Sequence, residues 1–151
     1  MAQPYVAENN EQRARLRALV ERVSDADLAR PLDAGWTVGA VLAHLAFWDE
    51  RVRILFERWR TSGVAPAAEE ASDVDWINDS AKALCLALTP RAAARLAVAT
   101  ADAVDRRVEA LSSELVAANS AAGTPLNLFR AEHRREHLDE IEHALGPSRA
   151  R

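Results

Sequence analysis

The chain has 151 residues, of which 49% are hydrophobic and 28% are charged, and its formal net charge is −4 at pH 7. This balance is typical of one folded domain and excludes a disordered chain, and no apolar run approaches the ~18 residues that a membrane span needs. The single cysteine excludes an internal disulfide and a zinc site built from cysteines. The acidic balance disfavours nucleic acid as the main partner, because nucleic-acid binders normally present a basic face.

The first residues show no positively charged start followed by an apolar block, so no signal peptide is predicted. We therefore expect a cytoplasmic protein that does not bind membranes. We expect residues 1–146 to form one helical domain and residues 147–151 to form a frayed tail.

Helical periodicity predicts a first long helix over about residues 7–23, followed by a polar loop that contains Pro31. A second long helix is expected after Thr37, whose hydroxyl can accept a hydrogen bond from an unpaired amide of the first turn. Gly63 is a natural end for this helix. Residues 64–73 then form a polar, alanine-rich connector.

The second half of the chain predicts a shorter helix over about residues 74–88 and a third long helix over about 90–115. Gly-Thr-Pro at 123–125 repeats the start signal, and the fourth long helix is expected to run to Leu145, where Gly-Pro ends it. No alternation typical of strands extends beyond a few residues. The sequence therefore predicts an all-α four-helix bundle with a short extra helix before the third long helix.

The four histidines are the main candidates for chemistry. His133 and His137 are four residues apart, so on a helix both rings project from one face and can bind one metal ion. On helical wheels, His44 lies at the margin of the core-facing stripe, and His133 and His137 lie about 80° and about 40° from the core-facing Ile141. His143 points almost opposite the core. Three histidines are thus expected to face inward.

The depth of the three histidines along the helices permits a shared site. His44 lies about 10 Å from the start of the second predicted helix, and His137 lies about 12 Å from the end of the fourth. An antiparallel pair of helices would place His44 level with His137, whereas a parallel pair would place it level with His133. The depth argument leaves the topology open.

A single histidine on an apolar face is more often a hydrogen-bonded core residue than a ligand, and this interpretation applies to His44 by itself. Three inward imidazoles are harder to explain in that way, because their desolvated nitrogens need partners and one cation would supply them. The pattern by itself leaves both interpretations open.

Two segments resemble motifs of the DinB-like superfamily. Residues 35–49 (GWTVGAVLAHLAFWD) resemble its second-helix signature, and residues 132–141 (EHRREHLDEI) resemble its last-helix motif of two histidines four apart. Residues 74–78 are similar too, though less specific. These families are damage-inducible four-helix metal proteins that include thiol-dependent S-transferases and maleylpyruvate isomerases. The resemblance extends over nearly the whole chain.

The resemblance implies a bundle with up-down-down-up connectivity and a long link between the second and third helices, which residues 61–73 could begin. It also implies a metal site formed by three histidines, which match His44, His133 and His137. Imidazole ligands suit Zn²⁺, Ni²⁺, Fe²⁺ or Cu²⁺, and the sequence does not distinguish them.

A site with three histidine ligands leaves a coordination position open, which is typical of catalytic sites. A thiol that occupies this position would lose its proton. The resemblance implies that a small thiol is added to an electrophile, so the expected function is that of a metal-dependent thiol S-transferase. The alternative is a metal-binding or structural, stress-related bundle without turnover, which forms a dimer.

Arg130 and Arg134 lie within about 20° of the core-facing direction on the last predicted helix. Arg130 is a candidate for binding the carboxylate of a substrate or thiol. The alternative for both arginines is a long side chain that reaches past the edge of the bundle into solvent.

Trp48, one turn beyond His44, is the tryptophan expected near a substrate pocket, whereas Trp36, Trp59 and Trp76 are expected to be core or interface anchors. Cys85 is flanked by leucines and has no cationic neighbour, so we predict a small core residue rather than a nucleophile.

Overall fold

The computed structural model describes residues 3–64 and 71–147, and these residues are helical apart from turns, loops and one isolated bridge between Pro31 and Thr37. The all-α class predicted from the sequence is confirmed. The elements are α1 (Pro4–Arg22), α2 (Asp25–Leu28), η1 (Asp33–Gly35), α3 (Val38–Ser62), α4 (Ala71–Ala87), α5 (Pro90–Glu109), α6 (Ser113–Ala121) and α7 (Arg130–Leu145). None of the described helices combines the length and apolar character that a membrane crossing requires.

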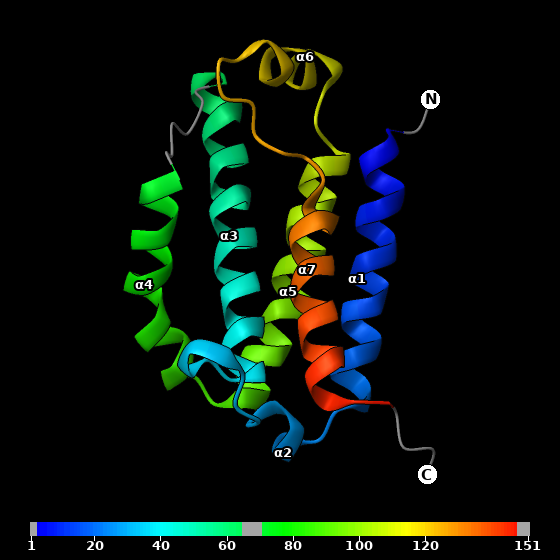
Figure 1. Cartoon of the computed structure of the whole chain (residues 1–151). Coiled ribbons are helices and arrows are strands. Elements are labelled where there is room, and N and C mark those ends of the chain that lie inside the picture. The colour runs from blue at the N-terminus through cyan, green and yellow to red at the C-terminus, as the bar shows by residue number, and fades with distance from the viewer. Residues whose placement is uncertain (1–2, 65–70, 148–151) are drawn as a thin grey trace.

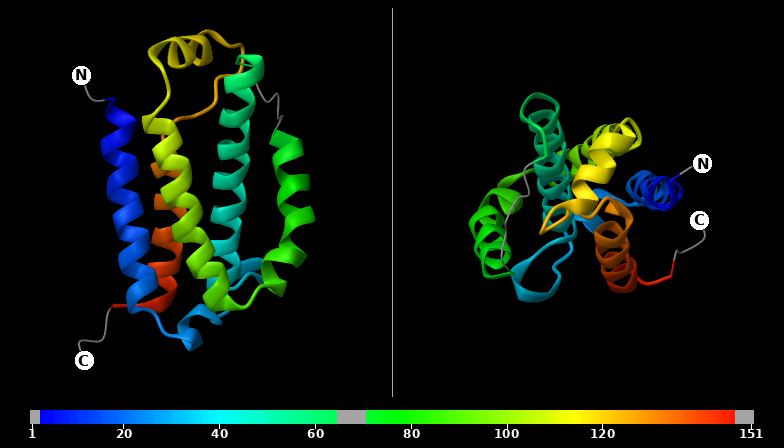
Figure 2. Two further views of the ribbon diagram at one scale, coloured as in Figure 1. Left: turned by 180° about the vertical axis from the view of Figure 1, so that it is seen from behind. Right: turned by 90° about the horizontal axis from the view of Figure 1, so that it is seen from above.

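The long helices α1, α3, α5 and α7 lie side by side, as Figures 1 and 2 show. In Figure 1 the chain descends through α1 and α7 and ascends through α3 and α5. The most extensive contact is between α3 and α5, while α1 packs against both α5 and α7. Helix α4 lies outside this group against α3, and α6 crosses one end.

Several helix boundaries agree with the local signals in the sequence. The Thr37 hydroxyl accepts a hydrogen bond from the Ala40 amide at 3.1 Å and so caps the start of α3. Helix α3 ends at Gly63 and α7 ends at Gly146, and both glycines have a positive φ that other residues rarely adopt. Pro90 is the first residue of α5, where its missing N–H leaves no bond unmade.

Other boundaries differ from the prediction. Helix α1 begins at Pro4, and the polar run after it is itself the short helix α2, because Ser24 and Asp27 form a reciprocal capping box. The third long helix ends at Glu109 and not near 115. A new helix, α6, begins there because the Ser112 hydroxyl accepts a hydrogen bond from the Leu115 amide at 3.2 Å.

The last helix begins at Arg130, several residues after the predicted start at 123–125. The Asn119 side chain bonds both the N–H and the C=O of Leu126 at 2.9 Å, which satisfies this backbone outside a helix. The extra helix predicted over 74–88 is α4, which begins at Ala71. Most of the predicted connector and residues 148–151 of the predicted tail lie outside the described residues.

Besides a small apolar cluster around Cys85, the buried interior holds two larger ones that follow one another along the helix axes. One includes Leu16, Leu42 and Leu138, and the other includes Phe56 and Val108. Between these clusters on their helices lie buried polar residues, which include Asn9, Asp49, Asp105, Arg130 and Arg134. The interior therefore contains a polar layer between two apolar layers.

Gly39 lets the start of α3 approach α5 closely. A Cβ atom at this position would lie 3.0 Å from Pro90 Cα and 3.3 Å from the carbonyl oxygen of Leu28. Both are main-chain atoms, so a side chain at position 39 would push α3 away from α5 and α2.

We therefore expect Gly39→Ala to lower the free energy of unfolding by about 1–3 kcal/mol, the usual range for overpacking. The matched control is Gly123→Ala, because a Cβ there meets no atom within 4 Å and the φ of Gly123 is not in the left-handed region. Urea unfolding of both variants tests this, and equal stability of the two would contradict the close approach.

Candidate metal centre

Three histidines from two helices meet at the inner surface between α3 and α7. His44 lies on α3, and His133 and His137 lie one turn apart on α7. One ring nitrogen from each lies within 4.8 Å of the others, and the Nε2 atoms of His44 and His133 are 3.1 Å apart. His44 is buried, and the other two are half-buried. The structure thus brings together the three histidines that the sequence predicted to face inward.

The ring of His44 lies almost equally far from both partners, with centroid distances of 5.1 Å to His133 and 4.9 Å to His137. From the sequence, His44 was expected to be level with His137 in an antiparallel pair of helices or with His133 in a parallel pair, but not with both. The structure therefore places the His44 ring beside both of the α7 histidines.

Neighbouring side chains hold two of the rings. The Nδ1 atom of His137 lies 3.0 Å from Glu140 Oε2, so an N–H there donates to the carboxylate and leaves the Nε2 lone pair for another partner. The Trp36 ring packs edge-on against the His44 ring, with centroids 5.7 Å apart. A carboxylate on the far nitrogen of a histidine is the usual support of a metal ligand, because it sets the tautomer and orients the ring.

The histidines lie where protonation is unfavourable. Burial, and then repulsion from His137, lowers the pKa of His44 from 6.5 to about 4. Burial is also the main cause that lowers the pKa of His133 to about 2, followed by the charges of His137, His44, Arg130 and Arg134. Both rings are therefore neutral at pH 7, which is the form that binds metal ions.

The donor set fits a divalent transition metal ion. Two nitrogens bound tetrahedrally at ~2.0–2.1 Å would lie about 3.3 Å apart, close to the 3.1 Å that separates the Nε2 atoms of His44 and His133. One N–H between these two nitrogens can satisfy only that pair, whereas a cation can be shared by all three rings. Three neutral imidazoles without a thiolate or carboxylate ligand suit Zn²⁺, Cu²⁺, Ni²⁺ or Fe²⁺.

Next to the histidines on α7 lies a buried network of charges. Arg134, which is 1% exposed, donates two bonds to Asp105 at 2.7 and 2.8 Å and two to Asp49 at 3.1 and 3.3 Å. Arg130 donates from Nε to the other oxygen of Asp49 at 3.1 Å. Both arginines are buried, so the alternative that they reach past the bundle edge is wrong.

The comparisons with known proteins now bear on this geometry. The family model described as the mycothiol maleylpyruvate isomerase N-terminal domain matches residues 10–142. The chain belongs to this family. The family is part of the DinB-like superfamily, so the resemblance found in the sequence is confirmed. No curated protein and no solved structure matches the chain significantly.

The sequence analysis of this family member missed both aspartates of the network. On helical wheels Asp49 lies about 60° from the buried Val52, and Asp105 lies about 40° from the buried Ala101. A carboxylate on the core-facing side of a helix is a signal of a buried ion pair, because such a charge is rarely buried without a partner. This signal was present in the sequence, although it did not indicate which residue of another helix is the partner.

The structure also shows where Cys85 and three of the tryptophans lie. Cys85 is 6% exposed in an apolar cluster, and burial raises the pKa of its thiol, so it is a core residue. Trp48 donates from its ring N–H to Asn78 at 2.8 Å and lines a groove between α3 and α4. Of the predicted core or interface anchors, Trp59 lies in the core, whereas Trp76 is 70% exposed and lies outside it.

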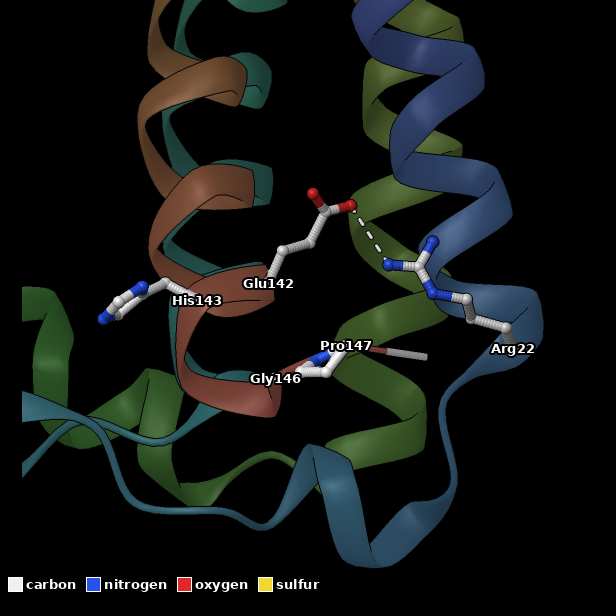
Figure 3. A pocket seen from close by; sticks show the side chains of 5 residues that line it. All are labelled: Arg22, Glu142, His143, Gly146 and Pro147. Carbon is white, nitrogen blue, oxygen red and sulfur yellow. Dashed lines mark hydrogen bonds and ion pairs between the residues drawn. The ribbon is translucent and has the colours of Figure 1, made fainter. Parts of the chain in front are cut away.

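A second hollow, at the end of α7, is distinct from the histidine cluster. Figure 3 shows Arg22 of α1 paired with Glu142 of α7, at 3.1 Å, while His143 points away from both. His143 is exposed, as its place on the helical wheel predicted. Its side chain lies outside the group of histidines that can hold an ion.

We expect the network to contribute strongly to stability. Arg134→Met leaves two buried carboxylates without their main partner, so the free energy of unfolding should fall by about 3–5 kcal/mol. The matched control is Arg135→Met, which removes only the exposed pair with Glu8 at 3.3 Å and should change stability by less than about 1 kcal/mol. Urea unfolding measures both, and similar losses would show that the network is not stabilising in this way.

Stability without metal should depend on pH through His44 and His133, because the pKa of each is lowered in the folded chain, and His44 contributes part of this dependence. The pKa of His44 is about 4 in the folded chain and 6.5 in the unfolded chain, so the unfolded state binds more protons in this window. The contribution of His44 to the free energy of unfolding should therefore be complete above pH 6.5 and should decrease as the pH falls toward 4. In the presence of a chelator, His44→Gln should flatten the fall of the urea midpoint between pH 7 and 5, and the exposed His143→Gln should not. An unchanged slope in His44→Gln would contradict this account.

Proposed function

We propose that the chain binds one divalent transition metal ion through His44, His133 and His137 and activates a low-molecular-weight thiol for transfer to an electrophile. The observation that carries the proposal is the convergence of three neutral ring nitrogens from α3 and α7 within 4.8 Å. The finer arrangement of the long helices as an up-down-down-up four-helix bundle is part of the same proposal.

The family supports a thiol as the substrate, since its name refers to mycothiol and to an isomerase of maleylpyruvate. Three protein ligands leave room for a further ligand, and the bound ion would supply the positive charge that deprotonates a thiol. The residues of this chain have separate roles. Glu140 orients His137, and Trp36 packs against His44 and restricts its ring.

Arg130 and Trp48 are the residues that we propose for binding the substrate. Arg130 lies one turn before His133 on α7, and Trp48 lies one turn after His44 on α3. Both line the same groove, which therefore extends alongside the two helices that carry the histidines.

The alternative is a bundle that binds metal without turnover. It is favoured by one observation, namely that the buried carboxylate of Asp49 already receives bonds from Arg130 and Arg134 and is therefore a poor general base. This alternative also includes the expected homodimer. Light scattering tests the dimer, and a cell fractionation experiment tests the cytoplasmic location.

The wild-type protein, purified without chelator, should contain about one equivalent of metal ion. His44→Ala and His133→Ala should lower the content at least tenfold, because each removes one of three ligands, whereas His143→Ala should not. Elemental analysis by mass spectrometry measures this. Loss of metal from the His143 variant alone would exclude the proposed ligand set.

A screen of mycothiol and smaller thiols against model electrophiles distinguishes the enzyme from the binding protein. Conjugation should stop in the presence of chelator and return when the ion is restored. Single-turnover conjugation that persists after metal removal, or in His44→Ala, would overturn the proposed mechanism. Full metal occupancy without conjugation of any thiol would favour the alternative.

A further inference from the structure

A groove of about 1270 Å³ runs between α3 and α4 and reaches α5 and the first residue of α7. Five large apolar side chains in its wall are at least 40% exposed, namely Ile54, Trp76, Leu84, Leu88 and Leu96. Exposed apolar side chains gathered along one groove are typical of a surface that binds an apolar ligand or partner.

One end of the groove carries a cation with unused hydrogen-bonding capacity. The Arg130 side chain lines the groove and is only 10% exposed. Its Nε donates to Asp49, but neither Nη atom has a hydrogen-bond partner among the described residues. Neither Nη atom is among the fully buried polar atoms of the described residues that lack a hydrogen bond, so both keep some exposure to solvent.

Arg130 makes fewer polar contacts than Arg134, because Arg134 pairs with both Asp105 and Asp49 and, in the described part of the chain, Arg130 pairs with Asp49 alone. Asp49 also receives two bonds from Arg134, so one carboxylate is shared by two guanidinium groups. Arg130 is moreover the first residue of α7, where the helix dipole favours an anion. Two N–H-bearing nitrogens of one guanidinium can bind both oxygens of a carboxylate.

We infer that this groove binds an anionic amphiphile, a free monocarboxylate with an extended apolar chain. Its carboxylate would pair with the Nη atoms of Arg130, and its apolar part would lie along α3 and α4 toward Leu84. This inference rests on the proposed function and deepens it, because Arg130 is one turn from His133. The amphiphile would be the electrophile where its chain carries a conjugated carbon–carbon double bond: the thiolate sulfur forms a bond to one carbon, the π bond breaks, the other carbon takes up a proton, and no group leaves.

A small anionic ligand without an apolar chain would pair with Arg130 but would leave most of the apolar wall uncovered. A second copy of the chain would cover the apolar wall, but it would bury the Nη atoms of Arg130 and would need to supply an anion to them. A ligand with an anionic group and an apolar chain would pair with the cation and also cover the apolar wall.

The test is calorimetric titration of metal-free protein with dodecanoate, dodecan-1-ol and dodecylammonium, with fluorescence of Trp48 and Trp76 as a second readout. Dodecanoate should bind at least tenfold more tightly than the alcohol and more tightly still than the cation. Equal binding of the three would overturn the inference.

Two pairs of variants locate the ligand. Arg130→Gln should weaken dodecanoate at least tenfold and leave the alcohol unchanged, while Arg130→Lys should restore part of the preference for the anion. Leu84→Glu should weaken both ligands. Leu86→Glu is the matched control, since Leu86 is 41% exposed on the same helix but does not line the groove. If the two glutamate variants behave alike, the groove is not the site.

Light scattering on the same samples measures the oligomeric state and so distinguishes binding of a small ligand from binding of a second copy of the chain. A dimer that Leu84→Glu dissociates, together with no binding of dodecanoate, would show that the groove is an interface between two chains and overturn the inference. Because the titration uses metal-free protein, it is independent of the proposed chemistry. Dodecanoate binding without metal or thiol activity would contradict only the proposed function.

Discussion

The position of α7 depends on the buried ion pairs of Arg134. Its guanidinium joins α7 to Asp49 on α3 and to Asp105 on α5, in a layer between two apolar clusters. Apolar side chains can slide past one another at small cost, but a buried charge that loses its partner is penalised by several kcal/mol. The network therefore sets the height of α7 along the bundle, and with it the height of the histidines one residue before and three residues after Arg134.

The histidine cluster and the charge network have opposite electrostatic requirements. Arg134 stays charged because two carboxylates surround it, whereas burial and the nearby arginines keep His133 neutral. Neighbouring positions of one helix thus present a fixed cation on one side and uncharged nitrogen donors on another. This separation keeps the histidines available for a metal ion at neutral pH without a protonated imidazole in the interior.

The same helix also connects the cluster to the groove. Arg130 belongs to the polar layer through its bond to Asp49, and it also lines the groove. A ligand anchored there would lie beside the face of α7 that carries His133. Ligand sites in bundles are commonly built in this way, from side chains that project from facing helices.

The sequence by itself determined the helical class, the starts of α3 and α5, the ends of α3 and α7, and which three histidines face inward. These features depend on neighbours within one or two turns, such as the hydroxyl of Thr37 and the left-handed glycines at positions 63 and 146. The sequence also carried the signal for the buried aspartates, although pairing them with Arg134 required knowledge of which helices touch.

Only the tertiary structure decided where α7 begins and that His44 meets both His133 and His137. The backbone before Arg130 is held by Asn119 and by Asn9, whose side-chain amide donates to the Leu128 carbonyl at 2.9 Å from 119 residues away. His44 and His133 are 89 residues apart. Periodicity describes one helix at a time, so contacts over such separations follow from how the helices pack and not from any local pattern.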